Sequence, residues 1–148
     1  MTAHAHRSSV STSIGSDRLA QPGYQAFLVL RVVFTVAPIL FGLDKFAEVF
    51  VDWDRYLAPW INDIVPGSAT DAMYAVGVIE VAAGLIVAVA PRYGAPLVAA
   101  WLGGIIFNLL TYSGYYDIAL RDFGLLVGAL ALWRLSMEYD RADRGTST

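Results

Sequence analysis

Residues 24–46, YQAFLVLRVVFTVAPILFGLDKF, decide the class of the fold. Arg31, Asp44 and Lys45 carry the only charges in this apolar stretch. A helix of this length rises roughly 34 Å at about 1.5 Å per residue, enough to cross a hydrocarbon core of about 30 Å. Charged side chains inside such a helix are expensive unless they face protein. The stretch therefore predicts a membrane-spanning helix with a polar, protein-facing side.

Three further apolar segments of similar length follow, at about 70–90, 94–112 and 116–137. Pro91 with Gly94, and Ser113 with Gly114, predict tight turns that place neighbouring helices antiparallel. The composition agrees, with 57% hydrophobic residues and 16% charged residues against roughly 45–50% and 25% in soluble domains. We therefore predict an all-α fold, a four-transmembrane-helix antiparallel bundle.

The only long connection lies between the first two helices. Its apolar residues recur at helical spacing and Pro59 interrupts them, while Trp53, Tyr56 and Trp60 suit a membrane interface. This pattern predicts a broken amphipathic segment on the outer surface. We expect a disordered cytoplasmic tail over 1–23, the four-helix membrane domain over 24–138 and a short polar tail over 139–148.

The basic residues predict the orientation in a bacterial cytoplasmic membrane. Under the positive-inside rule the richer side is cytoplasmic, which favours both termini inside. That side would hold Arg7, Arg18, Arg92, Arg134, Arg141 and Arg144, and the opposite side Lys45, Arg55 and Arg121.

Several function classes are excluded by composition. The chain has no cysteine, so thiolate zinc sites, iron–sulfur clusters and disulfides are absent. His4 and His6 are the only histidines and lie in the tail, which rules out a haem held by membrane histidines of this chain and leaves no predicted metal site. The net charge of −3 without a basic cluster argues against nucleic acid as a partner.

Polar and small residues share one face of each predicted helix. The first helix carries Arg31, Thr35, Pro38, Gly42 and Lys45 at alternating spacings of three and four. Glycines allow close backbone approach, so this face is expected to form the bundle interior. The same pattern gives Met73, Gly77, Glu80 and Gly84 in the second helix; Trp101, Gly104 and Asn108 in the third; and Asp117, Arg121, Gly124, Gly128 and Ala131 in the fourth, where GLLVG is expected to supply a GxxxG contact.

Glu80 would lie near the membrane midplane, with Lys45 and Arg121 as its expected partners and Arg31 on the inner side. Asp44 and Lys45 would lie at the outer mouth of this interior polar seam. A buried ion pair that only fixes helix register is the structural alternative. The candidate ligand-binding or seam residues are Arg31, Lys45, Glu80, Asn108, Arg121 and Asp122.

Three stretches resemble the DoxX-like family of integral membrane proteins: LRVVFTVAPILFGLDKF (30–46), GVIEVAAGLIVAVAP (77–91) and YYDIALRDFGLLVGALALW (115–133). Pro38 departs from the family pattern and is expected to kink the first helix. The resemblance implies a four-helix bacterial inner-membrane protein, in some members a subunit of quinone-linked oxidoreductases such as thiosulfate:quinone oxidoreductase. It also matches the family's recurrent positions with Arg31, Gly42, Lys45, Glu80, Arg121 and Asp122.

Three function hypotheses follow. The first is a non-catalytic membrane subunit or anchor without an intrinsic cofactor, which binds a quinone or lipid headgroup and a redox partner protein. The second is a small transporter or proton/ion pathway built around Glu80. The third is a lipid-modifying enzyme with Glu80 or Asp122 as general acid or base. Membrane lipid is a partner in all three, and the oligomeric state has no signature in the sequence.

Overall fold

The computed structural model describes residues 17–47, 49, 52–64, 67–111 and 114–145. Within these ranges the chain is helical and contains no strand, as predicted. The elements are α2 (Pro22–Ala47), the short 3-10 helix η1 (Trp53–Tyr56), α3 (Pro59–Ile64), α4 (Ala69–Val89), α5 (Pro91–Thr111) and α6 (Tyr116–Gly145).

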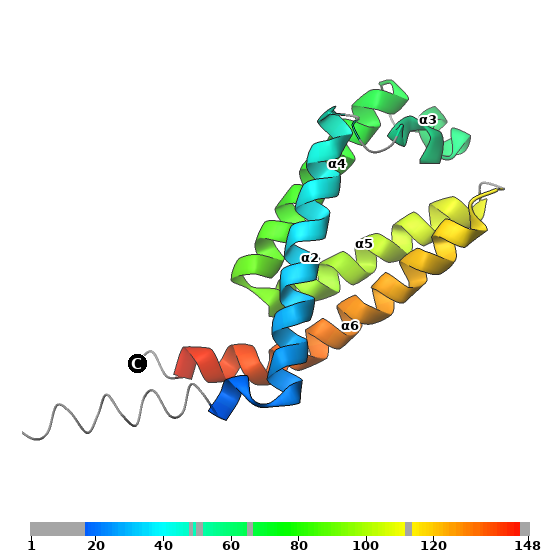
Figure 1. Ribbon diagram of the computed structural model, residues 1–148. Helices are drawn as coiled ribbons and strands as arrows, with labels where there is room; N and C mark the ends of the chain where they lie inside the picture. Colours follow the sequence, from blue (N-terminus) through cyan, green and yellow to red (C-terminus); the bar gives the residue numbers. More distant parts are fainter. Residues whose placement is uncertain (1–16, 48, 50–51, 65–66, 112–113, 146–148) are drawn as a thin grey trace, which may run out of the picture.

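The four long helices form two hairpins that diverge from each other (Figure 1). The α2 helix packs along α4, and α5 packs along α6. The hairpins meet where Ala90 joins α4 to α5 and where α2 crosses α6, which we call the narrow end. At the wide end, α2 finishes at Ala47 and α5 at Thr111. The sequence predicted helices packed as one bundle, whereas the structure has two hairpins that splay apart.

The apolar core lies toward the narrow end, where all four long helices contribute to it. Small and large side chains alternate there, which lets the helices approach closely while the volume stays filled. The buried members are Phe27 and Phe34 of α2, Ala83 and Val87 of α4, Ala95, Val98 and Ala99 of α5, and Ala129 and Leu132 of α6.

Three helices, α2, α4 and α5, are long and apolar enough to cross a membrane. The α6 helix is longer but has charged residues toward both ends, including Arg121, Asp122 and Arg134. Its uncharged stretch, residues 123–133, rises roughly 16 Å at about 1.5 Å per residue, half of a typical hydrocarbon core. The fourth predicted span therefore stays a prediction.

The helix boundaries follow from capping chemistry. Proline begins α2, α3 and α5, the position where its missing N–H costs nothing. Ser68 and Asp71 form a capping box at the start of α4, which satisfies two backbone N–H groups. Gly114 has a φ of +108°, a conformation available to glycine, and it lies in the predicted turn between α5 and α6.

Some predicted boundaries differ from the structure. Residues 17–19 are helical and 22–23 belong to α2, while 1–16 of the predicted tail lie outside the described residues. The predicted C-terminal tail from 139 is helical as far as Gly145, because α6 continues without a break. The α2 helix also runs through Pro38 without interruption. Pro59 begins α3 after η1, so the predicted break in the long connection is present.

Candidate functional site: a polar cluster at the wide end

Glycines bring α2 and α4 to backbone contact and so define the position of the charged residues. A Cβ on Gly42 would lie 2.7 Å from the Gly77 carbonyl oxygen, and one on Gly84 would lie 2.8 Å from the Thr35 carbonyl oxygen. Real Cβ atoms do not come this close to backbone atoms, so glycine is required at both positions. The predicted interior face is correct for these two helices, and it places Lys45 opposite Glu80.

Lys45 and Glu80 form a buried ion pair. The Lys45 Nζ donates to Glu80 Oε2 at 2.7 Å. The side chains are 4% and 11% exposed, respectively. Each ion offsets the desolvation cost of the other, so removing either one would leave a buried charge without its partner.

Trp53 of η1 covers this ion pair. Its ring centroid lies 3.7 Å from Lys45 Nζ, which is a close cation–π contact. Its indole N–H donates to Asp44 Oδ2 at 2.8 Å, and the backbone N–H of Val49 donates to Asp44 Oδ1 at 3.0 Å. Asp44, Lys45, Glu80 and Trp53 therefore form one connected set, which we call the polar cluster.

Asn108 of α5 holds the segment between α2 and α4. Its Nδ2 donates to the Tyr56 carbonyl oxygen at 2.7 Å, and its Oδ1 accepts from the Ala58 N–H at 3.0 Å. Beside it, the Trp60 indole donates to Thr111 Oγ1 at 3.0 Å. The segment over residues 53–64, which we call the strap, thus bridges the two hairpins at the wide end.

The remaining candidate residues lie apart from the polar cluster. Arg31 donates to the Ala88 carbonyl oxygen near the narrow end. Arg121 pairs with Asp122, the next residue of α6, at 2.9 Å, instead of with Glu80 as predicted. The Asp122 side chain is 6% exposed and that of Arg121 is 66% exposed. The long arginine stem carries its guanidinium out of the helix contact, so Arg121 is not an interior residue.

The predicted interior face of α6 is wrong. Asp117, Arg121, Gly124 and Ala131 are exposed, and a Cβ on Gly124 would meet nothing within 4 Å. Gly128 does contact a neighbour, Phe34 of α2. The buried residues of α6 follow a different stripe with spacings of three, four and seven: Ala119, Asp122, Ala129, Leu132, Ser136 and Asp140.

The α5 prediction is correct only in part. Gly104 is exposed with nothing within 4 Å of its missing Cβ, so it makes no close helix contact. Asn108 does face other protein, because it binds the strap. Trp101 is half-buried, and its indole nitrogen is buried without a hydrogen-bond partner in the described part of the chain.

Trp53 makes a contact that sequence analysis missed. Its placement among the interfacial aromatics stays a prediction, and its ring also covers the buried Lys45 ammonium. It lies nine residues beyond Asp44, with a non-helical connection between them. No helical or strand period relates residues across such a connection, so spacing carried no signal for this contact.

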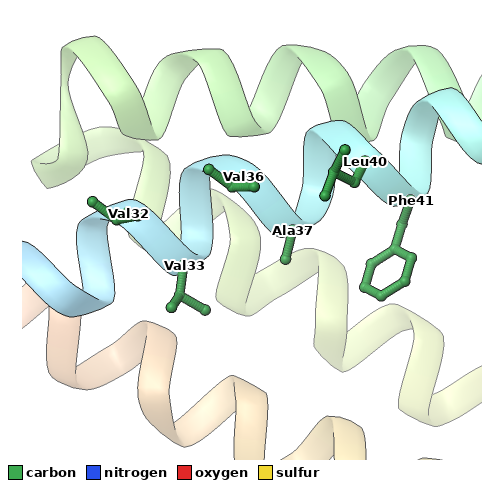
Figure 2. Close-up of a pocket in the computed structure, with 6 residues that line it drawn as sticks. All are labelled: Val32, Val33, Val36, Ala37, Leu40 and Phe41. Atoms are coloured by element: carbon green, nitrogen blue, oxygen red, sulfur yellow. The ribbon is translucent and has the colours of Figure 1, made fainter.

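An apolar hollow lies along an exposed face of α2. It has a volume of about 450 Å³ and is lined by Val32, Val33, Val36, Ala37, Leu40 and Phe41. Val33, Ala37 and Phe41 point away from α4 and toward the α5–α6 side (Figure 2). At the Phe41 end of the hollow, the Phe41 and Trp53 rings lie edge-on with their centroids 6.0 Å apart. The hollow therefore leads directly to the cover of the polar cluster.

The polar cluster joins one buried ammonium, two carboxylates and one indole ring. The described residues contain no group of three or more histidine or acidic side chains that could hold a metal ion. The Glu80 carboxylate accepts a hydrogen bond from the Lys45 ammonium at 2.7 Å and is buried, so it is already engaged within the protein. Within the cluster, the described hydrogen bond of the Lys45 ammonium is the one to Glu80 Oε2.

No family model, curated protein or solved structure matches this chain. The fold and site described above therefore stand on the chain's own residues.

Proposed function

We propose that the chain is a multi-pass protein of a bacterial cytoplasmic membrane, of the DoxX-like type that its three motifs resemble. In this proposal α6 joins α2, α4 and α5 as a fourth span, both termini are cytoplasmic, and the strap lies at the outer surface. The three apolar helices support the membrane location. The strap supports a membrane interface at the wide end, because Trp53, Tyr56 and Trp60 are the residue types enriched at membrane interfaces. The distribution of basic residues supports the outward orientation of that end.

The protein's role in this proposal is that of a non-catalytic subunit that binds a lipid-soluble molecule with a polar head. The observation that carries it is the continuity between the apolar hollow and the polar cluster. The hollow runs from Val32 to Phe41, Phe41 contacts Trp53, and Trp53 lies over Lys45. An apolar tail on α2 would bring a polar head to the only lysine of the chain.

A quinone and a glycerolipid both have this combination of tail and head. Electrons for a quinone would come from a partner protein, because the chain has no cysteine and the helices that the structure describes contain no histidine. Transport and acid–base catalysis are supported less well, since both need Glu80 to exchange protons and Lys45 holds its carboxylate at 2.7 Å.

The test is the molecule that copurifies with the protein in lipid nanodiscs, measured by mass spectrometry. We expect a quinone or a specific lipid in stoichiometric amount with the wild type, and its loss in Val36→Trp, which fills the hollow. Val78→Trp is the matched control, because Val78 is exposed on α4 and does not line the hollow. Equal occupancy in both variants, or an empty wild type, would overturn the proposal.

A further inference from the structure

The helices α2 and α6 diverge over a limited length, which we call the opening, and side-chain contacts bound it at both ends (Figure 1). Toward the narrow end, Gly128 of α6 lies against Phe34 of α2, and a Cβ on this glycine would be 3.2 Å from the ring. Toward the wide end, three ring contacts in series lead from α2 to the residue before α6, with centroids 6.0, 6.1 and 5.1 Å apart: Phe41 with Trp53, Trp53 with Tyr56, and Tyr56 with Tyr115. The opening is therefore tied at its wide end as well as at its narrow end.

Both walls of the opening leave space beside the helices. On α2, the apolar hollow of about 450 Å³ includes Val33, Ala37 and Phe41, which point toward the α5–α6 side (Figure 2). On α6, Gly124 lies one turn from Gly128 on the same side of the helix. A Cβ on Gly124 would meet nothing within 4 Å. An apolar wall with a hollow therefore faces a wall with room at a glycine.

Arg121 is the cationic residue of α6 that faces the opening. It lies seven residues before Gly128, and positions seven apart share one side of a helix. By the same spacing, Phe41 shares one side of α2 with Phe34. The two helices run in opposite directions, and Phe34 and Gly128 are in contact. Two turns toward the wide end, Phe41 and Arg121 therefore lie opposite each other across the opening.

The Arg121 guanidinium has donors that its described contacts leave unused. A guanidinium carries five N–H donors. The Nε and Nη2 atoms both donate to Asp122 Oδ1, at 3.0 and 2.9 Å. The Asp122 side chain is 6% exposed, whereas that of Arg121 is 66% exposed. The buried carboxylate thus holds one edge of the guanidinium and leaves the Nη1 donors for another acceptor.

The charges beside Arg121 select the class of acceptor. Asp122 already balances the charge of the guanidinium, so its attraction for a distant anion is small. Asp117, one turn nearer the start of α6 and also exposed, would repel an anionic head. An uncharged oxygen meets no such repulsion and still gains a charge-assisted hydrogen bond from the guanidinium.

We propose that Arg121 binds the polar head of the lipid-soluble ligand, and that this head presents an uncharged carbonyl or hydroxyl oxygen. The assignment rests on the proposed function, because the hollow on α2 holds the tail of the same molecule. The Lys45 side chain is 4% exposed and lies behind the Trp53 ring, whereas the Arg121 side chain is open. The head therefore lies beside the ring of Trp53 and accepts its hydrogen bond from α6.

Native mass spectrometry of the purified, delipidated protein tests the assignment, because it counts bound molecules directly. Decylubiquinone and monoolein are probes with uncharged oxygen acceptors on apolar tails, and lysophosphatidylglycerol is an anionic counterpart. We expect the wild type to bind an uncharged probe more tightly than the anionic one. In Arg121→Gln the affinity for that uncharged probe should fall about tenfold, the change that about 1.4 kcal/mol of lost interaction produces.

Arg134→Gln is the matched control, because Arg134 is a second exposed arginine of α6 and lies beyond the Phe34–Gly128 contact, outside the opening. It should bind the probe like the wild type. Arg121→Lys protects the test against misfolding of the glutamine variant. It keeps a cation beside Asp122 but loses the planar fork of donors, so its affinity should lie between wild type and Arg121→Gln. Wild-type affinity in both Arg121 variants would overturn the assignment, and so would an equal loss in Arg134→Gln.

Val36→Trp, which fills the hollow, separates failure of the assignment from failure of the proposed function. If it abolishes binding while Arg121→Gln binds like the wild type, the role of Arg121 is overturned and the proposed function stands. If the wild type binds none of the three probes, both are overturned. Tighter binding of the anionic probe would overturn the uncharged head. Binding of decylubiquinone alone, or of monoolein alone, would support the assignment and identify the source of the oxygen.

Discussion

The two hairpins carry the same sequence signature and use it differently. In α2–α4, Gly42 and Gly77 bring the two backbones into contact and an ion pair is buried between the helices. In α5–α6, a Cβ on Gly103 would lie 3.8 Å from Leu126, an ordinary contact, and one on Gly124 would meet nothing. The ion pair of that hairpin, Arg121–Asp122, is exposed on its cationic side. A stripe of small and charged residues therefore marks a helix contact only where both helices carry one in register.

The two hairpins should differ in the free energy of unfolding that a substitution costs, because their ion pairs are buried to different extents. A pair enclosed by protein loses most when one partner is removed, because the other ion stays buried. A pair with an exposed cation is weakened by solvent screening and contributes little. Substitutions in the α2–α4 hairpin should therefore cost more than the matched substitutions in α5–α6.

The largest effect is expected for Glu80→Gln, which leaves the Lys45 ammonium with a neutral partner. Breaking a buried pair costs about 3–5 kcal/mol in soluble proteins, and a polar contact between membrane helices contributes about 1 kcal/mol. We expect a loss within that span, measured by thermal unfolding in detergent. Glu138→Gln on the exposed side of α6 is the control and should unfold like the wild type. Replacing both ions, with Lys45→Met and Glu80→Gln together, should recover much of the loss.

If the double variant is no more stable than Glu80→Gln alone, the two residues are not coupled. The proximity of the two side chains would then make no contribution to stability.

The next largest effect is expected for Gly42→Ala. The new Cβ would lie 2.7 Å from the Gly77 carbonyl oxygen and 2.8 Å from Val81 Cγ2, so α2 and α4 must separate. Overpacking of this kind costs about 1–3 kcal/mol. Gly124→Ala adds the same atom where nothing lies within 4 Å, and the better helix propensity of alanine should leave stability unchanged or raised by up to about 1 kcal/mol. Equal destabilisation by both would remove the contrast between the hairpins.

A smaller effect is expected for Asn108→Ala, which removes the two hydrogen bonds of the Asn108 side chain to the strap and leaves the one between Trp60 and Thr111. Leaving a partly buried backbone group without its partner costs about 1–3 kcal/mol, less where water can replace it. The strap should also become more accessible to trypsin at Arg55, whose side chain is already exposed. Mass spectrometry of the fragments measures this. Unchanged cleavage after Arg55 would mean that Asn108 does not hold the strap.

The smallest effect is expected for Arg121→Gln. The guanidinium is exposed, and glutamine can still donate to Asp122, so the unfolding free energy should change by less than about 1 kcal/mol. The same thermal unfolding assay measures it beside Glu80→Gln. A loss as large as that of Glu80→Gln would place Arg121 in the interior, as the sequence first suggested.

Sequence reasoning succeeded where two physical requirements coincide. On α2 and α4, glycine and charge share one face, and a membrane helix needs both close packing and protein around its ions. This was enough to predict the Lys45–Glu80 contact and the glycine interface. On α6 the buried stripe combines small and apolar residues with Asp122, Ser136 and Asp140, whereas Gly124 is exposed and Gly128 only half-buried. Glycine and buried charge therefore do not share one face of α6, and the glycine pattern pointed to the wrong face.

The position of the strap depends on tertiary contacts that have no local period. Asn108 was predicted to face protein, but its partners are backbone groups of Tyr56 and Ala58 on a distant segment. The divergence of the hairpins is likewise invisible to helix periodicity. The divergence follows from the position of the apolar core, whose large and small residues lie at the narrow end. At the wide end, the strap bridges to α5 in the part of the chain that the structure describes.

The central claim is that two hairpins joined at the narrow end diverge and are bridged by the strap at the wide end. Spin labels on paired cysteines test it directly in nanodiscs, because the chain has no native cysteine to remove. Ala75 with Leu120 reports the wide end, and Val89 with Leu130 reports the narrow end; all four positions are exposed. We expect a clearly longer α4–α6 distance for the wide-end pair, with a broader distribution when Asn108→Ala is added. Equal distances for the two pairs would show parallel packed helices and contradict this account.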